Sequence, residues 1–261
     1  MQLNHYKISA SQESRSLSKH YLRFAILGII ITLIGFIPTY FRPLTENKEF
    51  ALIYHLHGLF CASWLILFLV QTALINRNNH KLHMKLGFLG IFIAVGVVIT
   101  LHRVEFVTAT RELQSGVGLG TQTFLGSGLL DPLAIGSLIT VAMVLRKKPE
   151  IHKRLTLLAT IILLWVSWVR LRYYFPPFPG NFDVFGFGFA MLPIPIFWVI
   201  EWRAHGKIHP IMFKAGMLVI LEQGLQVLAP YAGYNHQVMK LANHVYTSFG
   251  GELPNPYPIL P

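Results

Sequence analysis

The sequence predicts an all-α fold, a polytopic bundle of about seven transmembrane helices. Hydrophobic residues make up 53% of the 261-residue chain and charged residues only 13%, whereas about a quarter of a soluble domain is charged. The mean hydropathy is +0.51. Apolar windows of roughly 18 or more residues recur along the chain, and each can cross a hydrocarbon core of about 30 Å. These observations predict one membrane domain rather than a set of soluble domains.

The apolar windows divide the chain into a membrane domain and two polar tails. We expect residues 1–20 to form a polar cytoplasmic tail, residues 21–229 the seven-span membrane domain, and residues 230–261 a polar, Pro-rich outer tail whose final run, 254–261, is extended rather than helical. Pro38 should break the first span, and Pro193 with Pro195 should kink or unwind the sixth. The predicted spans are 21–40, 50–75, 86–101, 122–145, 155–171, 184–202 and 210–229.

Basic residues gather in the short turns on one side of the predicted bundle. With the N-terminus inside, the cytoplasmic segments hold fifteen of the 22 Lys and Arg residues, and the outer segments hold the other seven. This bias predicts a cytoplasmic N-terminus and, with seven spans, an outer C-terminus. It also assigns the net charge of +11 to membrane topology. We therefore expect the lipid bilayer, and no nucleic acid, as a partner.

The second span carries a stripe of polar and aromatic residues on one helical face. His57, Cys61, Trp64, Phe68 and Gln71 follow one another at spacings of three or four residues. Because lipid offers no hydrogen-bond partner, this stripe should face protein. It could line a cavity for a cofactor or substrate, or it could serve only the packing of helices against each other. The sequence leaves both interpretations open.

Histidines at the outer ends of the second and third spans are candidate metal or haem ligands. His57 and His102 should reach the same membrane depth, where imidazoles on facing helices could hold haem b or a transition metal. Trp64 and Gln71 would then line the cofactor. His55 and His57 project about 200° apart, so at most one of them belongs to a given site. The alternative is that these are interfacial histidines with ordinary hydrogen-bond partners, because the spacing matches no strict metal motif.

Ionisable residues inside the spans are candidate charge partners for such a site. Asp131 and Glu222 lie deepest, and charged groups within a bilayer usually mark function. Arg170 and Arg172 end the fifth span, where Arg170 could meet either acid. Arg172 shares a face with two tryptophans and could stack on them. The alternative for both arginines is an interfacial belt.

Two turns on the inner side repeat a pattern of His followed by basic residues. His83 opens one span, and His152, Lys153 and Arg154 open another. A shift of 69 residues places His83 over His152, which hints at a parallel duplication of helix pairs. We interpret these residues as an inner-face anchor of positive charge and snorkelling side chains. A site for an anion or a lipid headgroup at the helix N-termini is the alternative.

Spans two to five carry a resemblance to a known group. The runs HLHGLFCASWLILFLVQTALI, HMKLG and HKRLTLLATIILLWVSWVR resemble a group of poorly characterised bacterial multispan inner-membrane proteins. In that group a W…Q span is followed by an HxxLG turn, and an HKRLxLLAT span ends in Arg. The resemblance implies a bacterial inner-membrane location and no particular activity. The matching residues are His57, Trp64, Gln71, His83, Leu86, Gly87, His152, Lys153, Arg154, Leu155 and Arg170.

Three functions remain as hypotheses. The leading one is a membrane redox protein that binds haem b or a metal through His57 and His102. The second is a small-molecule or proton-coupled transporter in which Glu222 carries the proton. The third is a structural subunit of a membrane protein partner, with small residues at 87, 90 and 94 for close helix packing. No phosphate loop or nucleophile–base pair supports a hydrolase or a nucleotide-driven pump.

Overall fold

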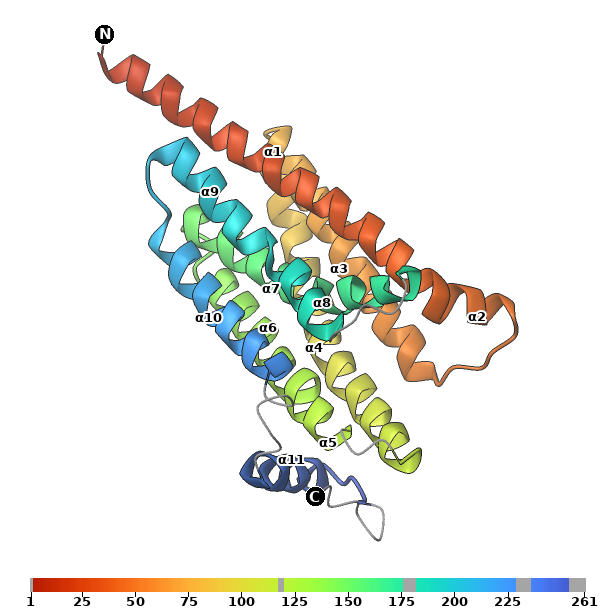
Figure 1. Cartoon of the computed structure of the whole chain (residues 1–261). Coiled ribbons are helices and arrows are strands. Elements are labelled where there is room, and N and C mark those ends of the chain that lie inside the picture. The colour runs from red at the N-terminus through yellow and green to blue at the C-terminus, as the bar shows by residue number, and fades with distance from the viewer. Residues whose placement is uncertain (1, 117–119, 176–181, 229–235, 254–261) are drawn as a thin grey trace.

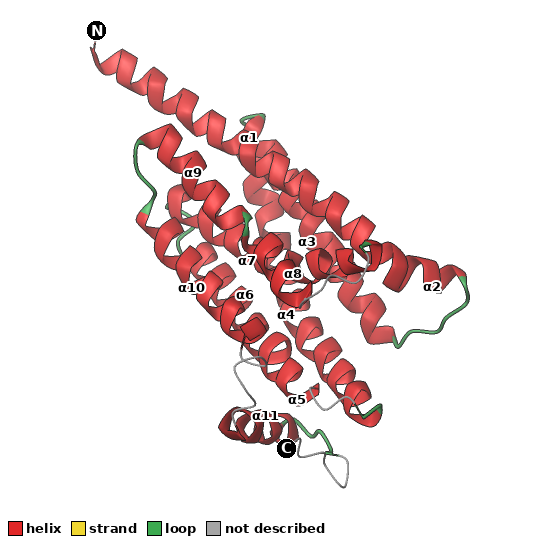
Figure 2. Cartoon of the chain, viewed as in Figure 1, coloured by secondary structure: helices red, strands yellow, loops and turns green. Residues whose placement is uncertain are grey.

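The computed structural model describes residues 2–116, 120–175, 182–228 and 236–253, and these ranges contain helices and no strand (Figure 2). The predicted all-α fold is confirmed. The long helices are α1 (Gln2–Phe36), α3 (Leu52–Asn76), α4 (His80–Gln114), α6 (Asp131–Val144), α7 (Pro149–Val169), α8 (Phe182–Met191), α9 (Pro193–His205), α10 (Pro210–Leu228) and α11 (His236–Ser248). The short elements are α2 (Arg42–Thr45), α5 (Gly120–Thr123), the π-helices η1 (Ile37–Phe41) and η2 (Phe124–Leu130), and the 3-10 helix η3 (Arg170–Tyr174).

Six helices in the described ranges are long and apolar enough to cross a membrane. They cover Leu17–Thr45, Leu52–Asn76, His80–Gln114, Phe124–Val144, Pro149–Tyr174 and Gly186–His205, and so match the first six predicted spans. The seventh predicted span is α10, which is not among the six. It carries four polar side chains among its apolar ones: Lys214, Glu222, Gln223 and Gln226. It still lies in the bundle, packed against α7 and α8 (Figure 1).

Helix α7 forms the centre of the bundle. It packs against α1, α6, α8 and α10, and Leu157, Leu158 and Ile161 are at most 1% exposed. A helix that is apolar on all sides is stable only when it is surrounded, and the sequence of α7 from Leu155 to Leu164 contains only two hydroxyl side chains among apolar ones. Helices α3 and α4, and likewise α6 and α7, form antiparallel pairs joined by short turns (Figure 1).

Prolines interrupt the helices where the sequence predicts it. Pro38 lies within the π-helix η1, and α8 ends at Met191 so that Pro193 can begin α9. Proline suits the first turn of a helix because that turn has no internal partner for its N–H. The third span is longer than expected, because α4 continues past residue 101 to Gln114. The N-terminal segment is also helical, since α1 begins at Gln2.

The C-terminal segment contains a helix that follows the predicted spans. Helix α11 lies across the end of the bundle beside α5 and η2 (Figure 1). Tyr246 is completely buried there, and its hydroxyl is 2.8 Å from that of Thr110. The expected extended run at 254–261 lies outside the described residues. We call this end of the bundle the α11 end, and the opposite end, with the basic turns after α3 and α6, the basic end.

Candidate functional site

The predicted ligand His57 is held by a chain of hydrogen bonds between α3 and α4. The Thr100 hydroxyl is 2.6 Å from the backbone oxygen of Gly96, which can only accept, so the hydroxyl donates to it. His57 Nδ1, 3.2 Å from the same hydroxyl, therefore donates to Thr100. His57 Nε2 lies 3.4 Å from Cys61 Sγ. The other candidate of this pair, His55, lies 2.6 Å from the Tyr40 hydroxyl instead.

The second predicted ligand, His102, is hydrogen-bonded to the π-helix η2. Its Nδ1 donates to the backbone oxygen of Gly128 at 2.7 Å. Four residues later stands Pro132, which has no N–H to offer this oxygen in a regular helix. A neighbouring side chain then satisfies the freed carbonyl, as a membrane helix requires. The ring of His102 also packs against Phe249, with centroids 4.8 Å apart.

The structure does not bring His57 and His102 together. His57 contacts Thr100, and His102 lies two residues further along α4, so it projects about 200° away from Thr100. In the described residues no group of three His, Cys, Asp or Glu side chains is placed to hold a metal ion. His57 therefore lies against one face of α4 and His102 projects from another face, so the two predicted haem or metal ligands do not meet.

The two predicted lining residues of the stripe contact other helices. Trp64 is buried, and its indole N–H donates to the Thr160 hydroxyl on α7 at 3.1 Å. Gln71 donates to the backbone oxygen of His83 at 3.2 Å. The stripe thus lies against α4 and α7, and both side chains take part in helix packing.

The arginines that end the fifth span do not reach the membrane acids. Arg170 donates to the Thr39 hydroxyl at 3.0 Å, and its guanidinium lies 4.2 Å from the ring centroid of Phe36. Arg172 lies over the ring of Tyr173. The expected stack on the tryptophans is replaced by aromatic pairs, Trp165 with Phe187 and Trp168 with Phe189. Arg170, the first residue of η3, thus connects the end of α7 to α1 and η1.

Asp131 and Glu222, the two deepest acids, do meet. Gln223 donates to Asp131 Oδ1 at 2.6 Å and to Glu222 Oε2 at 2.9 Å. Gln226 donates to the same Asp131 oxygen at 2.8 Å and is also hydrogen-bonded to Glu222 Oε1. We call these four residues the carboxylate–amide cluster. Asp131 is 5% exposed, and in the described part of the chain neither acid has an ion-pair partner.

Glycines of the π-helix η2 allow this cluster to form. A Cβ atom at Gly126 would lie 2.7 Å from Gln226 Oε1, so a larger residue there would push this amide of the cluster aside. A Cβ atom at Gly128 would lie 2.9 Å from Phe124 Cε2, so a larger residue there would displace the Phe124 ring. Asp131 begins α6 directly after the π-helix, and such irregular turns within helices often occur at functional sites. Sequence reasoning missed the two glutamines, although polar residues at 222, 223 and 226 of an apolar helix are a readable signal.

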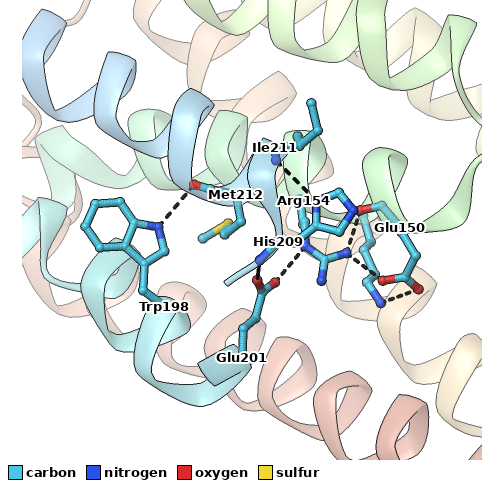
Figure 3. Close-up of polar contacts among 8 residues, drawn as sticks. Glu150, Arg154, Trp198, Glu201, His209, Ile211 and Met212 are labelled. Carbon is cyan, nitrogen blue, oxygen red and sulfur yellow. Dashed lines mark hydrogen bonds and ion pairs between the residues drawn. The ribbon is translucent and has the colours of Figure 1, made fainter. Parts of the chain in front are cut away.

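A second buried cluster lies near the basic end and corrects the prediction for Arg154 (Figure 3). Arg154 is 1% exposed, so it is not a snorkelling anchor. Its Nε donates to Glu201 Oε1 at 2.7 Å, and one terminal nitrogen donates to Glu150 Oε2 at 2.6 Å. Lys153 donates to the same carboxylate at 2.8 Å. The backbone N–H of His209 donates to Glu201 Oε2 at 2.9 Å.

We call Glu150, Lys153, Arg154 and Glu201 the ion-pair cluster. It joins α7 to α9 and to the start of α10, and the Trp198 indole reinforces the link with a 3.1 Å hydrogen bond to Met212 O (Figure 3). Sequence reasoning missed Glu201, which is 1% exposed, because it is the next-to-last residue of the predicted sixth span and directly precedes a basic turn. The remaining anchor residues, His83 and His152, lie ring to ring with centroids 6.4 Å apart.

Comparison with protein-family models, with curated proteins and with solved structures finds no match to this chain. The resemblance of spans two to five to bacterial inner-membrane proteins therefore stays a prediction. The candidate site rests on geometry alone, and the carboxylate–amide cluster is the strongest candidate.

Proposed function

We propose that the chain is a multispan membrane carrier that binds and releases a proton at the carboxylate–amide cluster. The observation that carries this proposal is the pairing of Asp131 and Glu222 through the same two glutamine amides, with no described cation beside either acid. Ionisable residues placed this way in a membrane protein usually belong to a proton or ion pathway.

Both carboxylates of the cluster are withdrawn from water, since Asp131 is 5% exposed and Glu222 is half-buried. Removing an ionised carboxylate from water costs several kcal/mol unless a partner of opposite charge is present. Two such groups that share hydrogen-bond donors also repel each other, and sharing one proton between them relieves both costs. The glutamine N–H groups can donate to either acid in its charged or neutral form. The cluster can therefore change its proton content without rebuilding its hydrogen bonds.

Carrier function also requires elements that can move. Irregular or interrupted helices beside a buried polar site are a common feature of transporters. Here η2 precedes Asp131 directly, and the break before Pro193 separates α8 from α9 next to α10. Glu222, the acid on α10, lies on a helix that packs against both α7 and α8. These features support coupling between proton binding and a change in the arrangement of α10.

We further infer that α10 crosses the membrane as a seventh span, with a cytoplasmic N-terminus in a bacterial inner membrane. Its 19 residues correspond to about 28 Å of helix, and the basic end holds most Lys and Arg residues, as a cytoplasmic face does. Reporter fusions after residue 261 test this topology. An alkaline phosphatase fusion should be active, and a fluorescent fusion that folds only in the cytoplasm should stay dark. The reverse pattern would contradict seven spans.

Infrared difference spectroscopy tests proton binding without knowledge of a substrate. The purified full chain, cycled between two pH values in detergent or lipid, should show the carbonyl band of a carboxyl group that gains a proton. Asp131→Asn and Glu222→Gln should each remove or shift this band. Glu252→Gln is the matched control, because Glu252 is exposed and its loss should leave the band unchanged.

Proton flux into proteoliposomes then tests transport. The flux should be lost in Glu222→Gln while the thermal stability of the protein is retained. A wild-type spectrum without a carboxyl band that depends on Asp131 or Glu222 would contradict the proposal.

The redox hypothesis is less favoured by the geometry, since His57 of α3 contacts Thr100 on one face of α4, whereas His102 projects from another face of α4 toward η2. It predicts a Soret band in the purified protein, whereas the carrier does not require one. The partner-subunit hypothesis predicts that a second membrane protein co-purifies in a fixed ratio. Both stay predictions.

A further inference from the structure

Three polar side chains converge at the basic end, apart from both clusters described above. Gln71 lies near the end of α3, His83 in the first turn of α4 and His152 in the first turn of α7. The Gln71 amide nitrogen donates to the backbone oxygen of His83, which fixes the side chain beside this histidine. The rings of His83 and His152 meet at 82° with centroids 6.4 Å apart. Helix packing thus joins the two histidines that a 69-residue shift aligns in the sequence.

Two atoms of this group are buried without a hydrogen-bond partner among the described residues. They are Gln71 Oε1 and His83 Nδ1. Buried polar atoms almost always have a partner, so each exception calls for an explanation. Because the Gln71 nitrogen is used by His83 O, the unpaired Gln71 atom is the oxygen, which can only accept. The group therefore needs a donor or a cation.

The hydrogen bond of His152 leaves the lone pair of its other ring nitrogen, Nε2, free to bind a ligand. His152 Nδ1 lies 2.9 Å from the backbone oxygen of Ala142. A carbonyl oxygen can only accept, so Nδ1 carries the proton and Nε2 of the neutral ring has a free lone pair. Metal-bound histidines are typically oriented in this way, by a hydrogen bond from the other ring nitrogen to a backbone oxygen or a carboxylate.

The spacing of the rings suits one small ion between them. A metal–nitrogen bond is about 2.0–2.1 Å long, so two imidazoles on opposite sides of one ion have centroids roughly 6 Å apart. The observed centroids, 6.4 Å apart, are close to this distance. An anion or a lipid phosphate would instead face the acceptor oxygen of Gln71 and be repelled.

The positive side chains near this group do not prevent a cation from binding, because they are paired with carboxylates or exposed to water. Lys153, next to His152, is paired with Glu150, and Arg154 is paired with Glu150 and Glu201. His80, Lys81 and Lys85 share α4 with His83, and their side chains are exposed, so water screens their charge.

We propose that Gln71, His83 and His152 form a binding site for one transition-metal ion of the zinc, nickel or copper class. His83 Nδ1, His152 Nε2 and Gln71 Oε1 supply the protein ligands, and water completes the coordination. Imidazole nitrogens are suited to these ions. This site is independent of the proton-binding proposal, since it shares no residue with the carboxylate–amide cluster.

Equilibrium dialysis of the purified full chain against Zn²⁺ or Cu²⁺, followed by elemental analysis, tests the site. We expect about one ion per chain, and an affinity at least about tenfold lower in His83→Asn and in His152→Asn. His80→Asn is the matched control, because this exposed histidine is on the same helix as His83. The affinity of the His80→Asn variant for the metal ion should equal that of the wild type. Gln71→Leu should weaken binding less than loss of either histidine.

Two further measurements keep the test decisive. The electron paramagnetic resonance spectrum of bound Cu²⁺ should show nitrogen ligands that disappear in His83→Asn. Zinc should raise the thermal midpoint of the wild type but not that of His83→Asn, which separates lost binding from lost folding if His152→Asn does not accumulate. The proposal is overturned if the wild type binds no metal ion, which would leave water in the site. It is also overturned if His80→Asn and His83→Asn lose metal binding equally.

Discussion

The ion-pair cluster and the carboxylate–amide cluster each contain two acids, one of which is buried, but they balance the negative charge differently. Near the basic end, Glu150 and Glu201 are matched by Arg154 and Lys153. Beside η2, Asp131 and Glu222 are matched only by the neutral amides of Gln223 and Gln226. The first cluster joins α7 to α9, and the second joins α6 to α10. Each is built from residues far apart in the sequence.

The difference separates a structural role from a functional one. A charge-balanced cluster is complete without any ligand, and it costs much free energy to break. A cluster of acids held by neutral donors needs a proton or another cation to be equally stable, so its occupancy can vary. We therefore expect substitutions in the ion-pair cluster to affect folding, and substitutions in the carboxylate–amide cluster to affect proton binding.

The largest expected effect follows from removing the cation of the ion-pair cluster. Arg154→Met leaves Glu201, which is 1% exposed, as a buried charge without a cation. Breaking a buried pair in this way costs about 3–5 kcal/mol. We expect a large fall in the thermal midpoint of the purified protein, or failure to accumulate in the membrane.

A double substitution sharpens this first prediction. Arg154→Met combined with Glu201→Leu removes both charges and fills the space with apolar atoms, an exchange that is often neutral for buried ion pairs. The double variant should regain most of the lost stability. If it remains as unstable as Arg154→Met alone, the damage does not come from the uncompensated charge of Glu201.

The second prediction compares one acid from each cluster. Glu201→Gln weakens two charge-assisted hydrogen bonds, from Arg154 and from the His209 backbone, and should cost about 1.5–3 kcal/mol. Asp131→Asn keeps an oxygen that accepts from Gln223 and Gln226 and breaks no described ion pair, so stability should be unchanged or raised. Thermal unfolding of both variants in the same detergent measures this contrast. Equal destabilisation would contradict the distinction between the clusters.

The third prediction concerns pH and His209, which caps the ion-pair cluster between α9 and α10. Burial lowers the pKa of His209 from its usual value, and the nearby Arg154 guanidinium lowers the pKa further. The geometry agrees, because His209 Nδ1 accepts a 3.2 Å hydrogen bond from the Ile211 backbone and must be unprotonated to do so. Below about pH 6.5 the unfolded chain binds more protons at this residue than the folded chain. Its contribution to stability is therefore complete above that pH and is lost as the pH falls.

His209→Asn tests this pH dependence. Asparagine can accept the same hydrogen bond at the start of α10 without titrating. The thermal midpoint of the variant should fall less steeply than that of the wild type between about pH 7 and pH 5. Parallel curves would show that His209 does not titrate in folding.

The sequence predicts the helices better than it predicts the contacts between them. Apolar length and turn chemistry place the first six spans and the break at Pro193, because these depend on local properties. The partner of Arg154 is Glu201, 47 residues away, and no local pattern distinguishes it from an exposed residue of a turn. His102 illustrates the same limit, since its role depends on a carbonyl that Pro132 leaves free on another helix. Charged residues were recognised as candidates, but their pairing depends on how the helices pack.

The smallest expected effect provides the baseline for the comparison. Arg42 and Glu46 form an ion pair at 3.0 Å, but their side chains are 74% and 60% exposed. Exposed pairs of this kind contribute less than about 0.5 kcal/mol, so Arg42→Ala should leave the thermal midpoint almost unchanged. Arg42→Ala and Arg154→Met each remove one ion-paired arginine, but Arg42 is exposed with one partner, whereas Arg154 is buried with two. If Arg42→Ala destabilised the protein as much as Arg154→Met, the loss of positive charge as such would be responsible, and the ion-pair cluster would have no special structural role.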